Sequence, residues 1–159
     1  RGLGDVYKRQ LGDVAVFIFF GLVPVTLTCL VQVGAWEWSS VSIPVGAAIG
    51  LMSANVLIVN NYRDADDDRA VGKTTLAILL GPTLTRGLYA ANALAAVALM
   101  WIVWAAISPW ALAVPAVYLV ASGGICMAMG RRTGAALTPL LGMTAVLILL
   151  YSVMLALLA

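Results

Sequence analysis

The stretch that decides the fold is residues 41–59, VSIPVGAAIGLMSANVLIV, which runs directly into residues 60–73, NNYRDADDDRAVGK. An uninterrupted apolar run of this length is enough to cross the hydrocarbon core of a bilayer as a helix. The polar segment that follows holds four Asp within five positions. The pair therefore predicts a membrane helix that ends in a charged segment at one face of the membrane.

The composition of the whole chain supports the same class. Of its 159 residues, 63% are hydrophobic and 10% are charged, and its mean hydropathy is +1.03. Soluble domains are about half apolar and a quarter charged, so this chain is predicted to be an integral membrane protein. A net charge of +2 gives no indication of nucleic-acid binding, and the lack of His removes the most common metal ligand and general base. Cys29 and Cys126 lie in apolar runs and are interpreted as small hydrophobic residues, not a disulfide.

Five apolar runs are long enough to span a membrane, and their continuous character favours helices over the alternating strands of a β-barrel. The fold class is therefore an all-α membrane bundle of five transmembrane helices. The polar segment 1–10 is interpreted as a non-native tail from sequence assembly, and 11–159 as part of one transmembrane domain. The predicted helices are 14–33, 41–61, 88–107, 110–129 and 137–158, with a loop at about 62–87.

The distribution of basic residues predicts the orientation. Six Lys and Arg residues fall in two of the four links, and five alternating helices place both links on one side. By the positive-inside rule that side is cytoplasmic, which puts the C-terminus on the outer side of a bacterial-type cytoplasmic membrane. The six are Arg63, Arg69, Lys73, Arg86, Arg131 and Arg132.

Glycines punctuate two of the predicted helices. Gly46 and Gly50 stand four residues apart in the second helix, and Gly123 and Gly124 lie in the middle of the fourth. Small residues inside membrane helices are typical of close helix packing. The alternative is that they leave room for a substrate.

The polar segment carries the candidate chemistry. Asn60, Asp64 and Asp68 stand at i, i+4 and i+8, so all three share one face if the helix continues past the membrane boundary, with Asn61 beside them. Two carboxylates one turn apart suit Mg²⁺, which binds one or two carboxylates together with phosphate oxygens and water. Asp64 and Asp68 are thus the candidate metal ligands.

Three cations lie among these acids and could hold the oxygens of a diphosphate: Arg63, Arg69 and Lys73. Lys73 is the preferred choice, because Arg63 could instead pair with Asp67. The competing interpretation is a solvated loop with local ion pairs. Amides in an apolar helix, as at Asn60 and Asn61, argue against it, because buried amides are costly in a membrane.

The string from Asn60 to Leu76, with its doubled Asn, Asp64, Asp68 and the Gly72-Lys73-x-Thr75-Leu76 end, resembles the second aspartate motif of the UbiA-type intramembrane prenyltransferases. It is most similar to the branch that prenylates 1,4-dihydroxy-2-naphthoate in menaquinone biosynthesis. The resemblance implies a nine-helix bundle with two aspartate motifs. This chain would supply helices five to nine and the second motif, so it is expected to be a fragment and inactive alone.

The resemblance also implies the reaction. A polyprenyl group would pass from polyprenyl diphosphate to 1,4-dihydroxy-2-naphthoate with decarboxylation, giving demethylmenaquinone, with Mg²⁺ on Asp64 and Asp68. Asn60, Asn61, Arg63, Arg69 and Lys73 would bind the diphosphate, and the partners would be the two substrates and membrane lipid. Three alternatives stay open. They are another UbiA-type aromatic prenyltransferase, a cation-binding transporter segment, and a structural membrane protein with a solvated loop.

Overall fold

A computed structural model describes residues 12, 14–34 and 41–158, so the proposed tail 1–10 lies outside the described residues. Every regular element in the described part of the chain is a helix. Five helices are long and apolar enough to cross a membrane, which confirms the predicted all-α class. These spans are Val14–Gln32, Ser42–Arg63, Leu76–Ala105, Pro109–Met129 and Gly134–Leu158.

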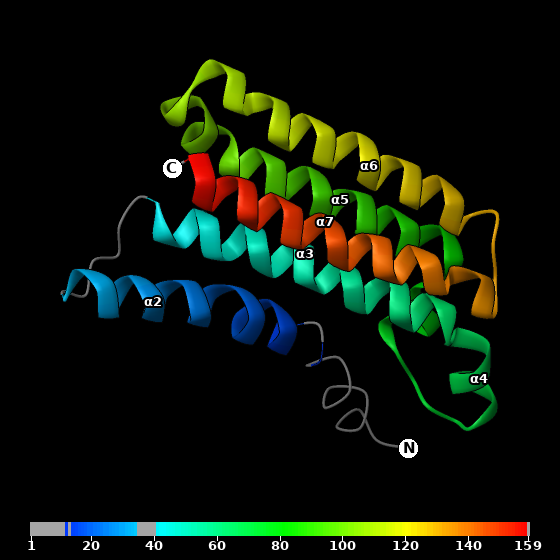
Figure 1. Ribbon diagram of the computed structural model, residues 1–159. Coiled ribbons are helices and arrows are strands. Elements are labelled where there is room, and N and C mark those ends of the chain that lie inside the picture. Colours follow the sequence, from blue (N-terminus) through cyan, green and yellow to red (C-terminus); the bar gives the residue numbers. More distant parts are fainter. Residues whose placement is uncertain (1–11, 13, 35–40, 159) are drawn as a thin grey trace.

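Four long helices form the bundle, and a fifth lies along one side of it (Figure 1). Helix α3 packs against α5 and α7, and α6 closes the bundle by packing against α5 and α7 in turn. The N-terminal span, a π-helical stretch η1 followed by α2, packs on α3. The bounds are η1 Ile18–Leu22, α2 Val23–Val33, α3 Ser42–Arg63, α4 Ala65–Ala70, α5 Leu76–Ile107, α6 Ala113–Met129 and α7 Thr138–Leu158, with short 3₁₀ turns η2 Pro109–Leu112 and η3 Gly134–Leu137.

The prediction of a loop at about 62–87 is wrong, because helices occupy much of that range. Helix α5 begins at Leu76 instead of at residue 88, and α4 occupies part of the segment before it. Thr75 caps α5, since its Oγ1 accepts a hydrogen bond from the Ile78 amide at 3.4 Å. Gly81 then breaks the helix with φ +72° and ψ 173°, and the helix resumes at Pro82. Proline suits the first position of a new helical segment, because its missing N–H has no helical partner there.

Glycines govern how the N-terminal span meets α3. A Cβ built on Gly21 would collide with Gly50 and would lie 2.5 Å from the carbonyl oxygen of Gly46, and one on Gly50 would lie 2.6 Å from that of Phe17. Backbone therefore contacts backbone, which confirms close packing for Gly46 and Gly50.

The same prediction is wrong for Gly123 and Gly124. A Cβ added at either position of α6 meets nothing within 4 Å. These two glycines leave open space on the helix surface instead of bringing two backbones together.

Buried polar contacts join three of the bundle helices, α3, α5 and α7. Asn55 of α3 donates from Nδ2 to the carbonyl oxygen of Tyr89 in α5 at 3.0 Å. Trp104 of α5 donates from Nε1 to the hydroxyl of Tyr151 in α7 at 2.5 Å, and the two rings meet edge-on with centroids 5.4 Å apart. Such bonds form in place of bonds to water, which a membrane interior lacks.

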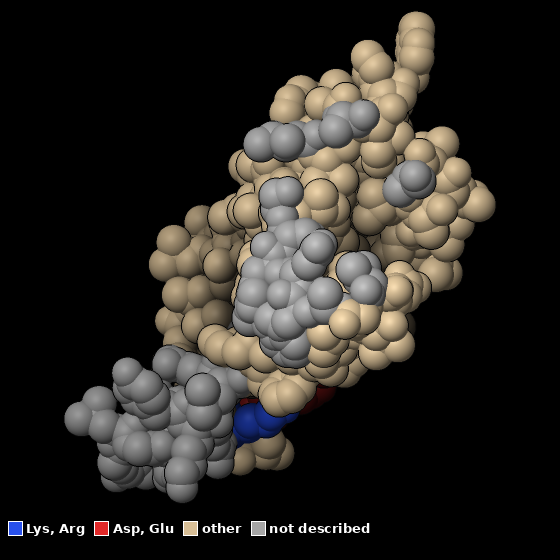
Figure 2. Space-filling model, turned by 90° about the vertical axis from the view of Figure 1, so that its left-hand side faces the viewer, with Lys and Arg blue, Asp and Glu red and all other residues tan. Residues whose placement is uncertain are grey.

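The outer surface of the bundle is apolar. Large hydrophobic side chains are exposed along the N-terminal span, α5, α6 and α7, among them Phe20, Leu94, Val120 and Leu149. On the face that Figure 2 shows, the described atoms are almost entirely tan, and charged atoms are confined to the lower edge. A surface of this kind requires lipid or further helices around it, which agrees with an integral membrane protein.

Candidate functional site

The candidate site lies at one end of the bundle, where α3 ends, α4 follows and the chain returns to α5 (Figure 1). Helix α3 ends at Arg63, and Asp64 has φ −91° and ψ 5°, outside the helical range. The Asp64 amide still bonds to the carbonyl of Asn60 at 3.0 Å, and the Asp68 amide to that of Asp64 at 2.8 Å. Asn60, Asp64 and Asp68 thus keep their one-turn spacing across a kink. The sequence predicts that they share one face of a continuous helix, but the structure interrupts that helix at Asp64.

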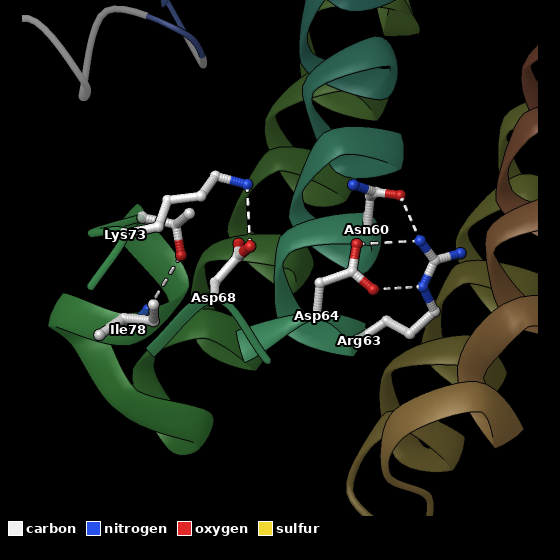
Figure 3. Close-up of polar contacts among 7 residues, drawn as sticks. Asn60, Arg63, Asp64, Asp68, Lys73 and Ile78 are labelled. Carbon is white, nitrogen blue, oxygen red and sulfur yellow. Dashed lines mark hydrogen bonds and ion pairs between the residues drawn. The ribbon is translucent and has the colours of Figure 1, made fainter. Parts of the chain in front are cut away.

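Arg63 holds the first aspartate of the site. Its Nε donates to Asp64 Oδ1 at 2.7 Å and its Nη2 to Asp64 Oδ2 at 2.9 Å, and Nη2 also donates to Asn60 Oδ1 at 3.0 Å (Figure 3). This two-pronged hydrogen bond lowers the pKa of Asp64 from its ordinary value, and the positive charges of Arg63 and Lys73 add to the effect. The alternative pairing of Arg63 with Asp67 is wrong in this structure.

Lys73 holds the second aspartate. Its Nζ lies 2.9 Å from Asp68 Oδ1, and its backbone amide also donates to the Asp68 carbonyl at 2.8 Å. Asp68 is 9% exposed, and its other carboxylate oxygen, Oδ2, is buried with no hydrogen-bond partner. In Figure 3 the carboxylates of Asp64 and Asp68 point to the same side. Buried carboxylate oxygens are normally paired, so this one is available to a ligand that the described residues do not supply.

The third predicted cation stands apart from these two pairs. Arg69 pairs with Asp66 at 3.0 Å, with side chains 59% and 91% exposed. Asp67 is exposed as well. The structure therefore brings together Asn60, Arg63 and Asp64 in one group and Asp68 with Lys73 in the next, and places Arg69 at the solvent side.

Two cavities open beside the charged pairs. One, of about 560 Å³, is lined by Asn61, by Lys73 and by the backbone turn up to Leu76. The other, of about 610 Å³, lies among the N-terminal span, α3 and α7, is mostly apolar, and has Asn60 on its wall. Leu57 lines both, so the two adjoin.

Sequence reasoning missed part of this lining. Thr74 and Thr75 line the first cavity. A Thr directly before an apolar helix is an N-cap signal, which could have located that turn. Ser53 and Ser152 line the second cavity from α3 and α7. No sequence signal shows that these two positions face each other.

The residues present fit a magnesium ion that is bound chiefly by its substrate. Among the described residues no three Asp, Glu, Cys or His side chains gather closely enough to form a metal site by themselves. Mg²⁺ needs no such group, since it usually binds through one or two carboxylates, substrate phosphates and water. Asp68 offers a free oxygen, and Asp64 keeps lone pairs beyond those that Arg63 occupies.

Comparisons with known proteins match the chain to a protein family and to individual relatives. The model of the UbiA prenyltransferase family matches residues 7–136. A 1,4-dihydroxy-2-naphthoate octaprenyltransferase of Mycobacterium leprae (strain TN) is 36% identical over 152 residues, which cover 93% of this chain and 49% of that protein. The protein of the same name from Mycobacterium tuberculosis is 35% identical, over 91% of this chain and 49% of its own length.

Another relative is the UbiA prenyltransferase domain-containing protein 1 homolog of Drosophila melanogaster, 37% identical over 70% of this chain and 30% of its own length. No solved structure matches the chain. The chain spans about half the length of the mycobacterial relatives. Since the family model covers most of the chain, this protein belongs to the UbiA prenyltransferase family.

Proposed function

We propose that the chain is part of an enzyme that transfers a polyprenyl group from polyprenyl diphosphate to 1,4-dihydroxy-2-naphthoate, with decarboxylation, to give demethylmenaquinol. Loss of two electrons and two protons to an oxidant such as dioxygen then converts this product into demethylmenaquinone. The observation that carries the proposal is the buried Oδ2 of Asp68, which no described residue pairs with, beside Lys73 at the polar end of an apolar bundle. The names of the two mycobacterial relatives support the choice of acceptor.

The two ion pairs account for how a diphosphate is bound. Lys73 is half exposed, and its three ammonium hydrogens are free to reorient, so it exchanges Asp68 for a phosphate oxygen at low cost. Arg63 is more enclosed and keeps Asp64 ionised and oriented. Asn61 lines the same cavity as Lys73 and offers an amide to the diphosphate, whereas Arg69 would contribute long-range positive charge from the solvent side.

The chemistry follows from charge separation at the membrane face. The allylic carbon–oxygen bond breaks, the diphosphate leaves with the electron pair, and the electron-rich ring forms a bond to the allylic carbon. The ring then loses carbon dioxide, and the released electron pair restores aromaticity. Mg²⁺ held by Asp64 and Asp68 would supply positive charge to the leaving diphosphate. Lys73 and Arg63 add donors aimed at the same negative charge.

The apolar cavity suits the prenyl tail. Its wall is built from Val16 and Phe20 of the N-terminal span, Leu141 and Leu149 of α7, and residues of α3. Asn60 marks its polar end, in direct contact with Arg63. A tail in this cavity would therefore enter with its diphosphate end at the two aspartates.

We also propose that this end faces the cytoplasm, with the C-terminus on the outer side. Arg131 and Arg132 lie in the α6–α7 connection, at the same end of the bundle as α4 (Figure 1). The positive-inside rule then assigns the orientation. Because the sequence contains one aspartate motif where the resemblance implies two, the chain forms one wall of the site. No turnover is expected from it alone.

A chimaera tests the proposal, with this chain replacing the matched half of the M. leprae relative in membranes that are supplied with Mg²⁺, polyprenyl diphosphate and 1,4-dihydroxy-2-naphthoate. We expect demethylmenaquinol, detected as demethylmenaquinone after oxidation by air, and a loss of about 100-fold or more with Asp68→Asn. Asp66→Asn is the matched control, because that carboxylate lies in solvent and should leave activity unchanged. Equal activity of the two variants would refute the role of Asp68. Prenylation of 4-hydroxybenzoate in preference to the naphthoate would assign the chain to another branch of the family.

A further inference from the structure

A third cavity lies apart from the two cavities beside the charged pairs and shares no lining residue with them. It measures about 690 Å³ and lies between α6 and α7. Its walls are apolar side chains such as Met143 and Val146, which are themselves more than half exposed. Its depth comes from Gly124 and Gly142, where an added Cβ would meet nothing within 4 Å. We call this space the α6–α7 groove.

Arg132 is the charged residue of the α6–α7 groove, and it lies at the polar end of the bundle. Arg131 precedes it, and both side chains are exposed. Neither forms an ion pair with a described residue. No Asp or Glu occurs anywhere after Asp68, so neither α6 nor α7 offers an acid to neutralise them. The groove therefore combines an apolar trough with an uncompensated positive charge at its mouth.

From this combination we propose that the α6–α7 groove binds one anionic phospholipid, with its phosphate on Arg132 and one acyl chain in the trough. Basic pockets between membrane helices bind acidic lipid headgroups in this way. The arginine contributes a charge-assisted bond to the phosphate, and the trough holds one acyl chain against apolar side chains. The proposal is independent of prenyl transfer, because the groove shares no lining residue with the cavities beside Asp64 and Asp68.

Two neighbouring residues provide matched controls. Gly123 is as open as Gly124 but does not line the groove. Leucine at Gly124 fills the groove, whereas leucine at Gly123 makes the same change to the helix and leaves the groove open. Arg86 is a basic residue whose guanidinium packs against Gly130 and is not part of the groove lining. Replacing it removes the same charge from the molecule and leaves the groove intact.

The test is native mass spectrometry of the purified chain in detergent, titrated with palmitoyl-oleoyl phosphatidylglycerol or with phosphatidylcholine carrying the same acyl chains. We expect one phosphatidylglycerol to bind about tenfold more tightly than phosphatidylcholine. Arg132→Gln should remove that preference, and Gly124→Leu should abolish retention of the lipid. Arg86→Gln and Gly123→Leu should bind as the unmodified chain does. Circular dichroism checks that all four variants keep their helices.

Several results would overturn the proposal. Equal retention of the two lipids would show that the headgroup charge is not recognised. Equal losses in Arg132→Gln and Arg86→Gln would reduce the effect to general attraction at a basic face. Equal behaviour of Gly124→Leu and Gly123→Leu would show that the groove is not the site. Displacement of phosphatidylglycerol by millimolar inorganic phosphate would mean that the arginines bind free phosphate and the trough adds nothing.

Discussion

Replacing Lys73 with Met should change metal binding and diphosphate binding in opposite directions. Lys73 Nζ lies 2.9 Å from Asp68 Oδ1, and the other carboxylate oxygen of Asp68 has no partner among the described residues. The Lys73 side chain is 53% exposed and that of Asp68 is 12% exposed, so water screens the pair mainly from the lysine side. Charges this close interact by about 1.4 kcal/mol in water, which is the minimum for this pair. A cation competing for Asp68 gains that amount when the ammonium is removed, which corresponds to about a tenfold tighter Kd.

The assay is electron paramagnetic resonance of Mn²⁺, as a paramagnetic substitute for Mg²⁺, added to the chain in detergent. Lys73→Met should bind Mn²⁺ about tenfold more tightly. In the presence of Mg²⁺ it should bind farnesyl thiodiphosphate about tenfold more weakly, because a charge-assisted bond to phosphate is lost. Arg69→Met is the control, since the exposed Arg69–Asp66 pair should contribute much less. Unchanged Mn²⁺ affinity in Lys73→Met would refute the assignment of Asp68 as a ligand that the lysine occupies.

Three further predictions concern the bundle and its polar end. Tyr151→Phe removes the hydroxyl that accepts the buried indole hydrogen bond between α5 and α7, and should lower the free energy of unfolding in a detergent titration by about 1 kcal/mol. Gly21→Leu forces a side chain into the backbone of α3 and should cost about 1–3 kcal/mol in the same titration. Gly87→Leu, at an open glycine, should cost little. Asp64 has a lowered pKa, so its pair with Arg63 stabilises the fold above the ordinary pKa of 3.8 and is lost as pH falls through the lowered value. Thermal unfolding followed from about pH 2 to 5 should show this loss, and Asp64→Asn should remove that part of the pH dependence.

The membrane helices follow closely from the sequence, because length and apolarity alone decide which segments cross a bilayer. The second run, predicted at 41–61, is helical over Ser42–Arg63, and the last, predicted at 137–158, is helical over Thr138–Leu158. The third was placed too late. Residues 76–80 are too few to cross a membrane and are followed by Gly81-Pro82, which is typical of a break, yet α5 resumes beyond that break.

Contacts between helices are harder to predict from the sequence. Gly46 and Gly50 pack closely because Gly21 and Phe17 lie opposite them, whereas Gly124 faces a groove. The composition of one helix does not reveal which neighbour lies across from each glycine.

In the candidate site, too, the sequence predicts some features and not others. That Asp64 and Asp68 lie together at the membrane face follows from their spacing. Which cation holds which carboxylate does not, because the kink at Asp64 sets the direction of each side chain. It turns Arg63 onto its immediate neighbour, Asp64.

The kinks at Asp64 and Gly81 also bear on how such a protein changes over evolution. The segment between them carries most of the charged side chains of the candidate site and joins the bundle at both ends through non-helical residues. A continuous helix passes a tilt or a rotation along its whole length, but these breaks interrupt that transmission. We therefore expect substitutions in this segment to disturb the packing of the membrane helices less than substitutions inside α3 or the part of α5 beyond Gly81.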